Sequence, residues 1–215
     1  MNLTHEQQAV AVQEAIKYKY VWENCESYGN KHHDFDLFER LDRSCKIGCI
    51  PELYSSVIVL GCGAGSLVRY LDYLEYKTMG IDIYPHPFWA RGFVRTGDQN
   101  TGFTHRMFKE QCLWDDLPRL EVGVNWDSFI CADVLEHIPE ILLGDVLGNI
   151  ASHCNSGVFQ IANMESKFNG YDLHLIREDV GWWLDVIQMA MGGKVNQIDD
   201  PDVPRSRFVI YWKAL

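Results

Sequence analysis

Residues 57–65 read VIVLGCGAG, a run of four apolar residues followed by three glycines at alternate positions. A short apolar run that ends in glycines is typical of a buried strand turning sharply into a helix. We therefore expect a strand at residues 55–60, a turn at Gly61-x-Gly63-x-Gly65 and a helix at residues 66–75. In an open α/β sheet, ligands bind outside the carboxyl ends of the strands, so this turn marks a candidate site.

From this strand onward, strand-like and helix-like patterns alternate along the chain. Further strands are expected at residues 78–84, 106–113, 126–133, 157–163, 194–198 and 208–212. Helices are expected at residues 139–153 and 177–191, with a short helix at 85–92 and a loop at 95–102. The last two strands follow one another without a helix, which predicts a C-terminal antiparallel hairpin. The predicted fold class is α/β: a single doubly wound, mostly parallel seven-stranded sheet.

The first 50 residues differ in pattern from the rest of the chain. Thr4 followed by Gln7 makes a capping box, which predicts a first helix. Four residues at helical spacing predict its apolar face, namely Ala9, Val12, Ile16 and Tyr20. A second helix is expected from Asp34 or Asp36 to Gly48. We expect residues 1–50 to form a helical segment of their own and residues 51–215 to form the sheet domain.

Charge and hydropathy restrict the class of protein. Nineteen basic and 30 acidic residues give a net charge of −11, and no dense basic stripe is present, so nucleic acid is an unfavoured partner. No apolar run reaches the roughly 20 residues that a membrane span requires, and the N-terminus lacks a signal-peptide core. The seven cysteines include no CxxC pair, which favours free thiols in a reducing compartment. We expect a cytoplasmic protein without a membrane partner; the pattern makes no prediction of oligomeric state.

The second strand ends in Asp82, directly after Gly80 and Ile81. A carboxylate at this position can accept hydrogen bonds from both hydroxyls of a ribose, which predicts an adenosine-type ligand. Dinucleotide-binding turns have the spacing GxGxxG, which places a pyrophosphate at a helix N-terminus. The spacing here is GxGxG. A ligand without a pyrophosphate is therefore favoured over NAD.

Three ordered motifs resemble those of class I S-adenosylmethionine-dependent methyltransferases, in particular the members that act on small molecules. Residues 57–65 are similar to the first motif of that family, residues 80–83 to the second, and FICADVLEHIP at 129–139 to its fourth-strand motif. The resemblance covers about residues 55–215. It implies a Rossmann-like fold, S-adenosylmethionine as cofactor and S-adenosylhomocysteine as product. It also implies that the helical residues 1–50 form a lid over the cofactor and substrate.

The resemblance also implies which residues contact the cofactor. Gly61, Cys62 and Gly63 would lie along the methionine moiety, with Gly65 completing the turn. Asp82 would hold the ribose. The remaining implied contacts are Ile83 on the adenine, Leu113 or Trp114 on its other face, the backbone of Ala132, and Asp133.

The chain departs from the family pattern at two places. The acidic residue usually found two positions before the first glycine is replaced by Val59, which removes a contact near the amino group of the cofactor. Asp133 is a candidate to compensate for it. The acidic residue often found after the third strand is also missing, and Asp115 is the nearest carboxylate. A degenerate cofactor site is the alternative.

Two histidines and a tyrosine are candidate catalytic residues. Methyl transfer needs the reactants to be positioned and a proton to be removed from the acceptor. His137 follows the fourth strand, His174 follows the fifth, and Tyr171 is a weaker candidate for the same pocket. The alternatives are a structural histidine at a helix start and a loop histidine without a role.

Asp133, Glu136, His137 and His174 form a possible metal-ligand set. The pattern D-x-x-E-H resembles E-x-x-E-H in small-RNA 3′-end 2′-O-methyltransferases. Leu-Glu-His-Ile is also common in members of the family that use no metal, where Glu136 braces the helix. We therefore predict no metal and retain the set as an alternative.

The favoured function is S-adenosylmethionine-dependent methyl transfer to an oxygen or nitrogen of a small-molecule acceptor. One alternative is a metal-assisted 2′-O-methyltransferase acting on RNA, and another is a non-catalytic cofactor-binding module. Four aromatic residues of the N-terminal segment are expected to cover the adenosine or an apolar substrate, or else to pack in the core. These are Tyr18, Tyr20, Trp22 and Tyr28.

Overall fold

A computed structural model describes residues 3–25, 28, 33–43, 55–85, 107–199 and 201–215. The expected helix at residues 85–92, apart from its first residue, and the expected loop at 95–102 lie outside this part of the chain. The same holds for the expected end of the second helix at Gly48.

The described residues form a seven-stranded sheet in the order β3-β2-β1-β4-β5-β9-β8. Its strands are β1 (Ser56–Leu60), β2 (Lys77–Asp82), β3 (Phe108–Glu110), β4 (Ser128–Ala132), β5 (Ser156–Ala162), β8 (Lys194–Ile198) and β9 (Arg207–Lys213). Strand β9 runs antiparallel to both of its neighbours, and the other described pairs are parallel. The predicted α/β sheet with a C-terminal antiparallel hairpin is confirmed.

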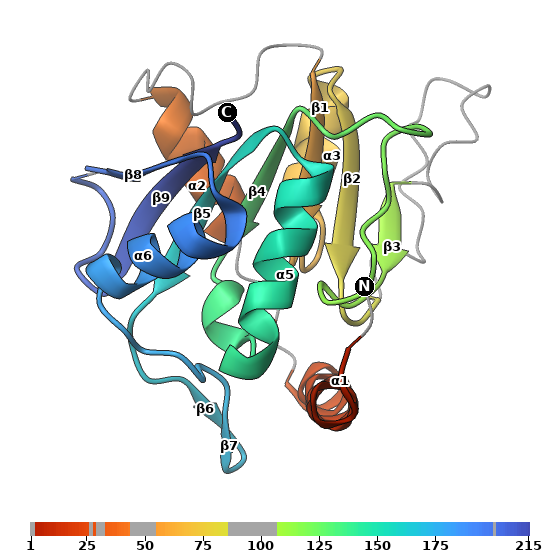
Figure 1. Cartoon of the computed structure of the whole chain (residues 1–215), viewed down its shortest axis with the longest axis vertical. Coiled ribbons are helices and arrows are strands. Elements are labelled where there is room, and N and C mark those ends of the chain that lie inside the picture. The colour runs from red at the N-terminus through yellow and green to blue at the C-terminus, as the bar shows by residue number, and fades with distance from the viewer. Residues whose placement is uncertain (1–2, 26–27, 29–32, 44–54, 86–106, 200) are drawn as a thin grey trace.

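Helices cover both faces of the sheet (Figure 1). The helices on the two faces are α2 (His33–Arg43), α3 (Ser66–Tyr73), α5 (Glu140–His153) and α6 (Val180–Met191). Helix α1 (His5–Asn24) lies beyond the end of the sheet toward which β2 points, and a 3-10 turn η2 (Leu135–His137) precedes α5. A small hairpin of β6 (Lys167–Phe168) and β7 (Tyr171–Asp172) stands outside the sheet.

Alternation along β1 divides the core into two clusters. Ile58 and Leu60 face a cluster with α5 and α6, while Val57 and Val59 face a cluster with α2 and α3. This is the pattern of a central strand covered on both sides, in which every residue is buried.

The N-terminal helix begins as predicted but buries a different face. Thr4 and Gln7 form the reciprocal capping bonds. The predicted apolar face is wrong, because Val12 and Ile16 are 60% and 65% exposed, and Ala9 and Tyr20 are also exposed. The buried residues are Ala11, Lys17, Tyr18 and Val21. Polar contacts orient the helix: the Lys17 ammonium lies 3.4 Å from the carbonyl of Asp172, and the Tyr18 hydroxyl donates to the carbonyl of Leu173.

Two other predicted boundaries shift for local reasons. The third strand is limited to residues 108–110 because the chain turns out of the sheet after Gln111, where Asp115 N–H donates to the carbonyl of Cys112. Helix α6 begins at Val180 because Asp179 caps it, accepting a hydrogen bond from the N–H of Trp182. Among the described residues, no helix combines the length and apolar composition that crossing a membrane requires.

Candidate active site

A cavity of about 330 Å³ lies where the glycine turn, the end of β4 and the N-terminal helices meet. Its volume is within the range of small-molecule sites. All of the predicted cofactor-contacting residues except Gly65 line it: Gly61, Cys62, Gly63, Asp82, Ile83, Leu113, Trp114, Ala132 and Asp133.

The glycine turn has backbone angles that other residues rarely adopt. Gly61, Gly63 and Gly65 have φ of 68°, 52° and 78°. A Cβ at Gly61 would lie 2.2 Å from a methyl group of Val134, and one at Gly65 would lie 2.2 Å from the ring of Phe108. Gly65 is therefore required for packing at the start of α3 and does not line the cavity.

Asp82 lies at the end of β2, buried beside the turn. Its Oδ2 accepts a hydrogen bond of 2.8 Å from the N–H of Gly63. Burial raises the pKa of Asp82 to about 6, although backbone N–H groups from Gly63, Tyr84 and Ile83 oppose that shift. The carboxylate is thus held rigidly at the cavity wall.

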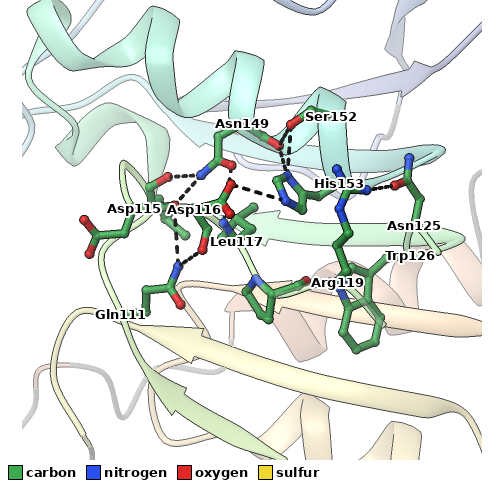
Figure 2. A network of polar contacts seen from close by, with 12 residues as sticks. Gln111, Asp115, Asp116, Leu117, Arg119, Asn125, Trp126, Asn149, Ser152 and His153 are labelled. Atoms are coloured by element: carbon green, nitrogen blue, oxygen red, sulfur yellow. Dashed lines mark hydrogen bonds and ion pairs between the residues drawn. The ribbon is translucent and has the colours of Figure 1, made fainter. Parts of the chain in front are cut away.

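The side chain of Asn149 fixes the loop that follows β3 (Figure 2). Its Nδ2 donates to the carbonyls of Leu113 and Asp115, and its Oδ1 accepts from the N–H of Leu117 at 3.3 Å. The amide of Gln111 donates to the carbonyl of Asp116 at 2.8 Å. This network holds Leu113 and its neighbour Trp114 against the cavity. Asn149 was not identified from the sequence; it lies on the buried face of α5, which also carries His153.

Asp133 lies in an ion pair instead of offering a free carboxylate. The guanidinium of Arg207 donates to both of its oxygens at 2.6 to 3.1 Å, and Gln160 Nε2 donates at 2.9 Å. His33 Nε2 lies 3.4 Å away. Burial alone would raise the pKa of Asp133, but Arg207 and His33 hold it below its ordinary value. Arg207 was not identified from the sequence.

His137 and His174 lie side by side at the cavity, their ring centroids 4.7 Å apart. His137 Nδ1 is 2.9 Å from both the carbonyl of Leu173 and the hydroxyl of Tyr18. His174 Nδ1 is 2.6 Å from the carbonyl of Met164. A carbonyl only accepts, so each Nδ1 carries the proton and each Nε2 has the lone pair.

Burial keeps both imidazoles neutral. It lowers the pKa of His137 to about 3, assisted by His174, and it lowers the pKa of His174 as well. A group with a pKa near 3 is a weak proton acceptor at neutral pH, so His174 is the better candidate base of the two.

The predicted tyrosine is not in the cavity. Tyr171 lies on β7, is 43% exposed and contacts the ring of Tyr20. Of the aromatic residues predicted to cover the ligand, Tyr18, Trp22 and Tyr28 line the cavity and Tyr20 does not. Phe168 of the β6–β7 hairpin lines it as well.

Glu136 is fully buried below the two histidines. Its Oε1 accepts from the N–H of Ala162, and its backbone carbonyl accepts from the N–H groups of Leu175 and Ile176. Its Oε2 has no hydrogen-bond partner among the described residues. Burial, followed by the charge of Asp133, raises the pKa of this carboxyl well above its ordinary value.

Three of the four possible metal ligands come together. One ligand atom from each of Glu136, His137 and His174 lies within 4.8 Å of the other two. Asp133 is outside this group, because its carboxylate is bonded to Arg207. The Glu136 side chain accepts from the N–H of Ala162 and so braces the end of β5, whereas the alternative interpretation expected it to brace the helix.

No family model matches the sequence, and no curated protein matches it. Solved structures do match. A 1,6-didemethyltoxoflavin-N1-methyltransferase from Burkholderia thailandensis, with its substrate and S-adenosylhomocysteine bound, aligns over 100% of this chain and 93% of its own, with 15% identity and a TM-score of 0.63. The chain has the fold of S-adenosylmethionine-dependent methyltransferases.

Two further structures extend this likeness. The magnesium protoporphyrin IX methyltransferase of Synechocystis, with S-adenosylmethionine bound, aligns over 94% of this chain and 97% of its own, with 15% identity and a TM-score of 0.63. The methyltransferase domain of bacterial CtHen1 aligns over 86% and 98%, with 16% identity and a TM-score of 0.54. The strand order β3-β2-β1-β4-β5-β9-β8 is that of the methyltransferase fold.

The structure adds cavity residues that sequence reasoning passed over. Asp34 was expected only as a possible start of the second helix, yet both Asp34 and His33 line the cavity. A signal was available for Asp34, because it precedes Leu37, Phe38 and Leu41 at helical spacing and so shares their buried face. Met164 precedes β6 and Phe168 lies in it, in a segment for which the sequence pattern predicted no element.

Proposed function

We propose that this protein transfers a methyl group from S-adenosylmethionine to an oxygen or nitrogen atom of a small-molecule acceptor. The observation that carries the proposal is that one cavity contains the glycine turn, the buried Asp82 and two neutral histidines. The methyltransferase fold supports it, and so do the two solved structures that have S-adenosylmethionine or S-adenosylhomocysteine bound.

The cavity has the hydrogen-bond acceptor and the apolar surface that the cofactor requires. Asp82 uses one oxygen on the N–H of Gly63 and keeps further lone pairs for ribose hydroxyls. Ile83, Leu113 and Trp114 provide an apolar wall suited to an adenine ring. When bound, S-adenosylmethionine supplies an electrophilic methyl group on its sulfonium.

We assign the contacts with the methyl acceptor to the part of the cavity that His137 and His174 line. The carbonyl of Met164 holds the His174 ring in the tautomer whose Nε2 can accept a proton. His137 is fixed by Leu173 and Tyr18 and supports the ring of His174. Tyr18 belongs to α1, so in this proposal α1 is the part of the lid that takes part in the site.

The lining favours an apolar, planar acceptor. Trp22, Tyr28 and Phe168 contribute aromatic surface to the cavity. The net charge of −11 opposes the approach of a polyanion. Both features favour a small aromatic hydroxyl or amine over RNA.

The test is transfer of an isotopically labelled methyl group to a panel of aromatic hydroxyls and amines, followed by mass spectrometry. We expect at least one compound to gain one labelled methyl group with formation of S-adenosylhomocysteine. Cofactor binding without transfer to any member of a broad panel would favour the non-catalytic module instead.

A second candidate function is metal-assisted 2′-O-methylation of RNA; a cytoplasmic location is proposed for the protein under either function. The convergence of Glu136, His137 and His174 favours it, since a divalent metal there would lower the pKa of a hydroxyl acceptor. Labelled methyl transfer to a short RNA in the presence of Mn²⁺, abolished by EDTA, would support this candidate. Unchanged transfer to a small acceptor in EDTA would oppose it.

A further inference from the structure

Asp34 has a buried carboxylate oxygen to which no described residue donates. It lies in the first turn of α2, is 8% exposed and lines the cavity. Its Oδ1 accepts a hydrogen bond of 2.8 Å from the N–H of Phe35. Its Oδ2 has no hydrogen-bond partner within the described part of the chain.

Packing of α2 places Asp34 beside the glycine turn. Leu37, Phe38 and Leu41 of α2 belong to the same core cluster as Val59 and Cys62. Asp34 is one turn before Leu37 and Phe38, so it extends the same helix face toward the cavity. The charge of Asp34 acts on the thiol of Cys62, and Asp34 and Asp82 repel one another electrostatically.

A buried anionic oxygen requires a cation or a donor, because desolvation without compensation is costly. The two other carboxylates lining the cavity already have donors: Asp133 is bonded to Arg207, and Asp82 accepts from Gly63. Arg69 lies close enough to interact with Asp34 electrostatically, but its guanidinium donates to the carbonyl of Ala64. Burial raises the pKa of Asp34 to about 7, as expected for a carboxylate that lacks a bound cation.

We propose that Asp34 binds a primary ammonium group of the ligand in this cavity. Under the proposed function, on which this inference rests, that group is the α-ammonium of S-adenosylmethionine and of S-adenosylhomocysteine. An ammonium supplies both a positive charge and N–H donors, which are the two things that Oδ2 lacks.

This assignment also accounts for Val59. Position 59 is fully buried in the cluster that contains Leu37 and Phe38, so a carboxylate there would be covered by α2. The helix that covers Val59 brings its own carboxylate to the cavity. The acidic group is thus supplied by α2 in place of β1.

The experiment measures ligand affinity by calorimetry for wild-type protein, Asp34→Asn and Asp36→Asn. The Asp34→Asn substitution keeps the oxygen that accepts from Phe35 N–H and removes the charge. Asp36, two residues along the same helix, is exposed and serves as the matched control. Two ligands are compared: S-adenosylhomocysteine, and 5′-methylthioadenosine, which has the adenosine and thioether but no ammonium.

We expect Asp34→Asn to weaken S-adenosylhomocysteine binding by tenfold or more and to leave methylthioadenosine binding within twofold of wild type. Asp36→Asn should bind both ligands as wild type does. Unchanged S-adenosylhomocysteine affinity in Asp34→Asn, or an equal loss for both ligands, would overturn the inference alone. Failure of the wild-type protein to bind S-adenosylhomocysteine would instead refute the proposed function, and the inference with it.

If Asp34→Asn does not fold, as judged by circular dichroism, Asp34→Glu gives a second measurement. The longer side chain keeps the charge and displaces it by one methylene group. Reduced selectivity for S-adenosylhomocysteine over methylthioadenosine in Asp34→Glu would support the inference, and unchanged selectivity would oppose it.

Discussion

Replacing Asn149 by alanine should loosen the wall of the cavity that Leu113 and Trp114 form. The substitution removes three hydrogen bonds to the loop backbone: two donated by Nδ2 to the carbonyls of Leu113 and Asp115, and one accepted by Oδ1 from Leu117 N–H. Asn149 is 1% exposed, so water cannot replace these bonds without local rearrangement.

The expected loss in the free energy of unfolding follows from the number of hydrogen bonds that the substitution removes. At about 1 kcal/mol for each intramolecular hydrogen bond, the loss is about 3 kcal/mol in the free energy of unfolding. For a chain of this length, that corresponds to a fall in Tm of roughly 6 to 12 °C. Because the loop that moves is part of the adenine wall, S-adenosylhomocysteine binding should weaken by about tenfold at a temperature where the variant is fully folded.

Thermal unfolding and calorimetric titration at 10 °C measure the two effects separately. Asn155→Ala is the matched control, because Asn155 lies just beyond the same helix and is exposed. The control should have the Tm and affinity of the wild type. A Tm of Asn149→Ala within 2 °C of wild type would refute the role of this network. A large fall in Tm with unchanged affinity would show that the network does not support the binding wall.

Other substitutions test the remaining parts of the site. Asp82→Ala should weaken S-adenosylhomocysteine binding more than tenfold in calorimetry, because ribose hydroxyls would lose their acceptor; unchanged affinity would place the cofactor elsewhere. His174→Ala should lower kcat strongly and His137→Ala less so, with cofactor affinity retained in both; full turnover in both variants would end the catalytic assignment. Arg207→Met should lower the free energy of unfolding by about 3 kcal/mol at pH 7, because the buried Asp133 carboxylate loses its cation. The folded-state pKa of Asp133 is depressed, so its stabilising contribution is present above the ordinary aspartate pKa and is lost as pH falls through the lower folded value. Tm measured against pH should therefore show the gap between wild type and Arg207→Met closing in acid, and a gap that stays constant down to pH 2 would contradict this assignment.

The part of the fold that the sequence predicted well is the part in which local and global signals agree. The apolar run of β1 and the alternating glycines specify a strand, a turn and a helix by backbone requirements alone. The consecutive strands at the C-terminus predicted the antiparallel β9 for the same reason. The position of Asp82 at the end of β2, beside the glycine turn, was also predicted, and its role in binding a ribose stays a prediction.

The errors come from contacts that only tertiary packing creates. The orientation of α1 depends on hydrogen bonds from Lys17 and Tyr18 to a distant loop, so apolar spacing predicted the wrong face. Asn149 and Arg207 act on residues 36 and 74 positions away, and no local pattern marks such pairs.

The position of an acidic residue within a motif also did not show which carboxylate is available at the cavity. The replacement of the family's acid by Val59 indicated a missing contact, and Asp133 was the nearest substitute along the motif. The structure shows Asp133 engaged by Arg207, and it shows an Asp34 oxygen at the cavity that accepts from none of the described residues. Which carboxylate is available depends on which cations lie nearby in space, and the sequence does not encode that in any local spacing.

Calorimetric titration of S-adenosylmethionine and S-adenosylhomocysteine into the purified protein, with NAD as the control, tests the proposed cofactor site most directly. Micromolar affinity for both sulfur compounds and no binding of NAD is the predicted result. Binding of neither sulfur compound, or binding of NAD with comparable affinity, would contradict the assignment of this cavity to a methyl donor.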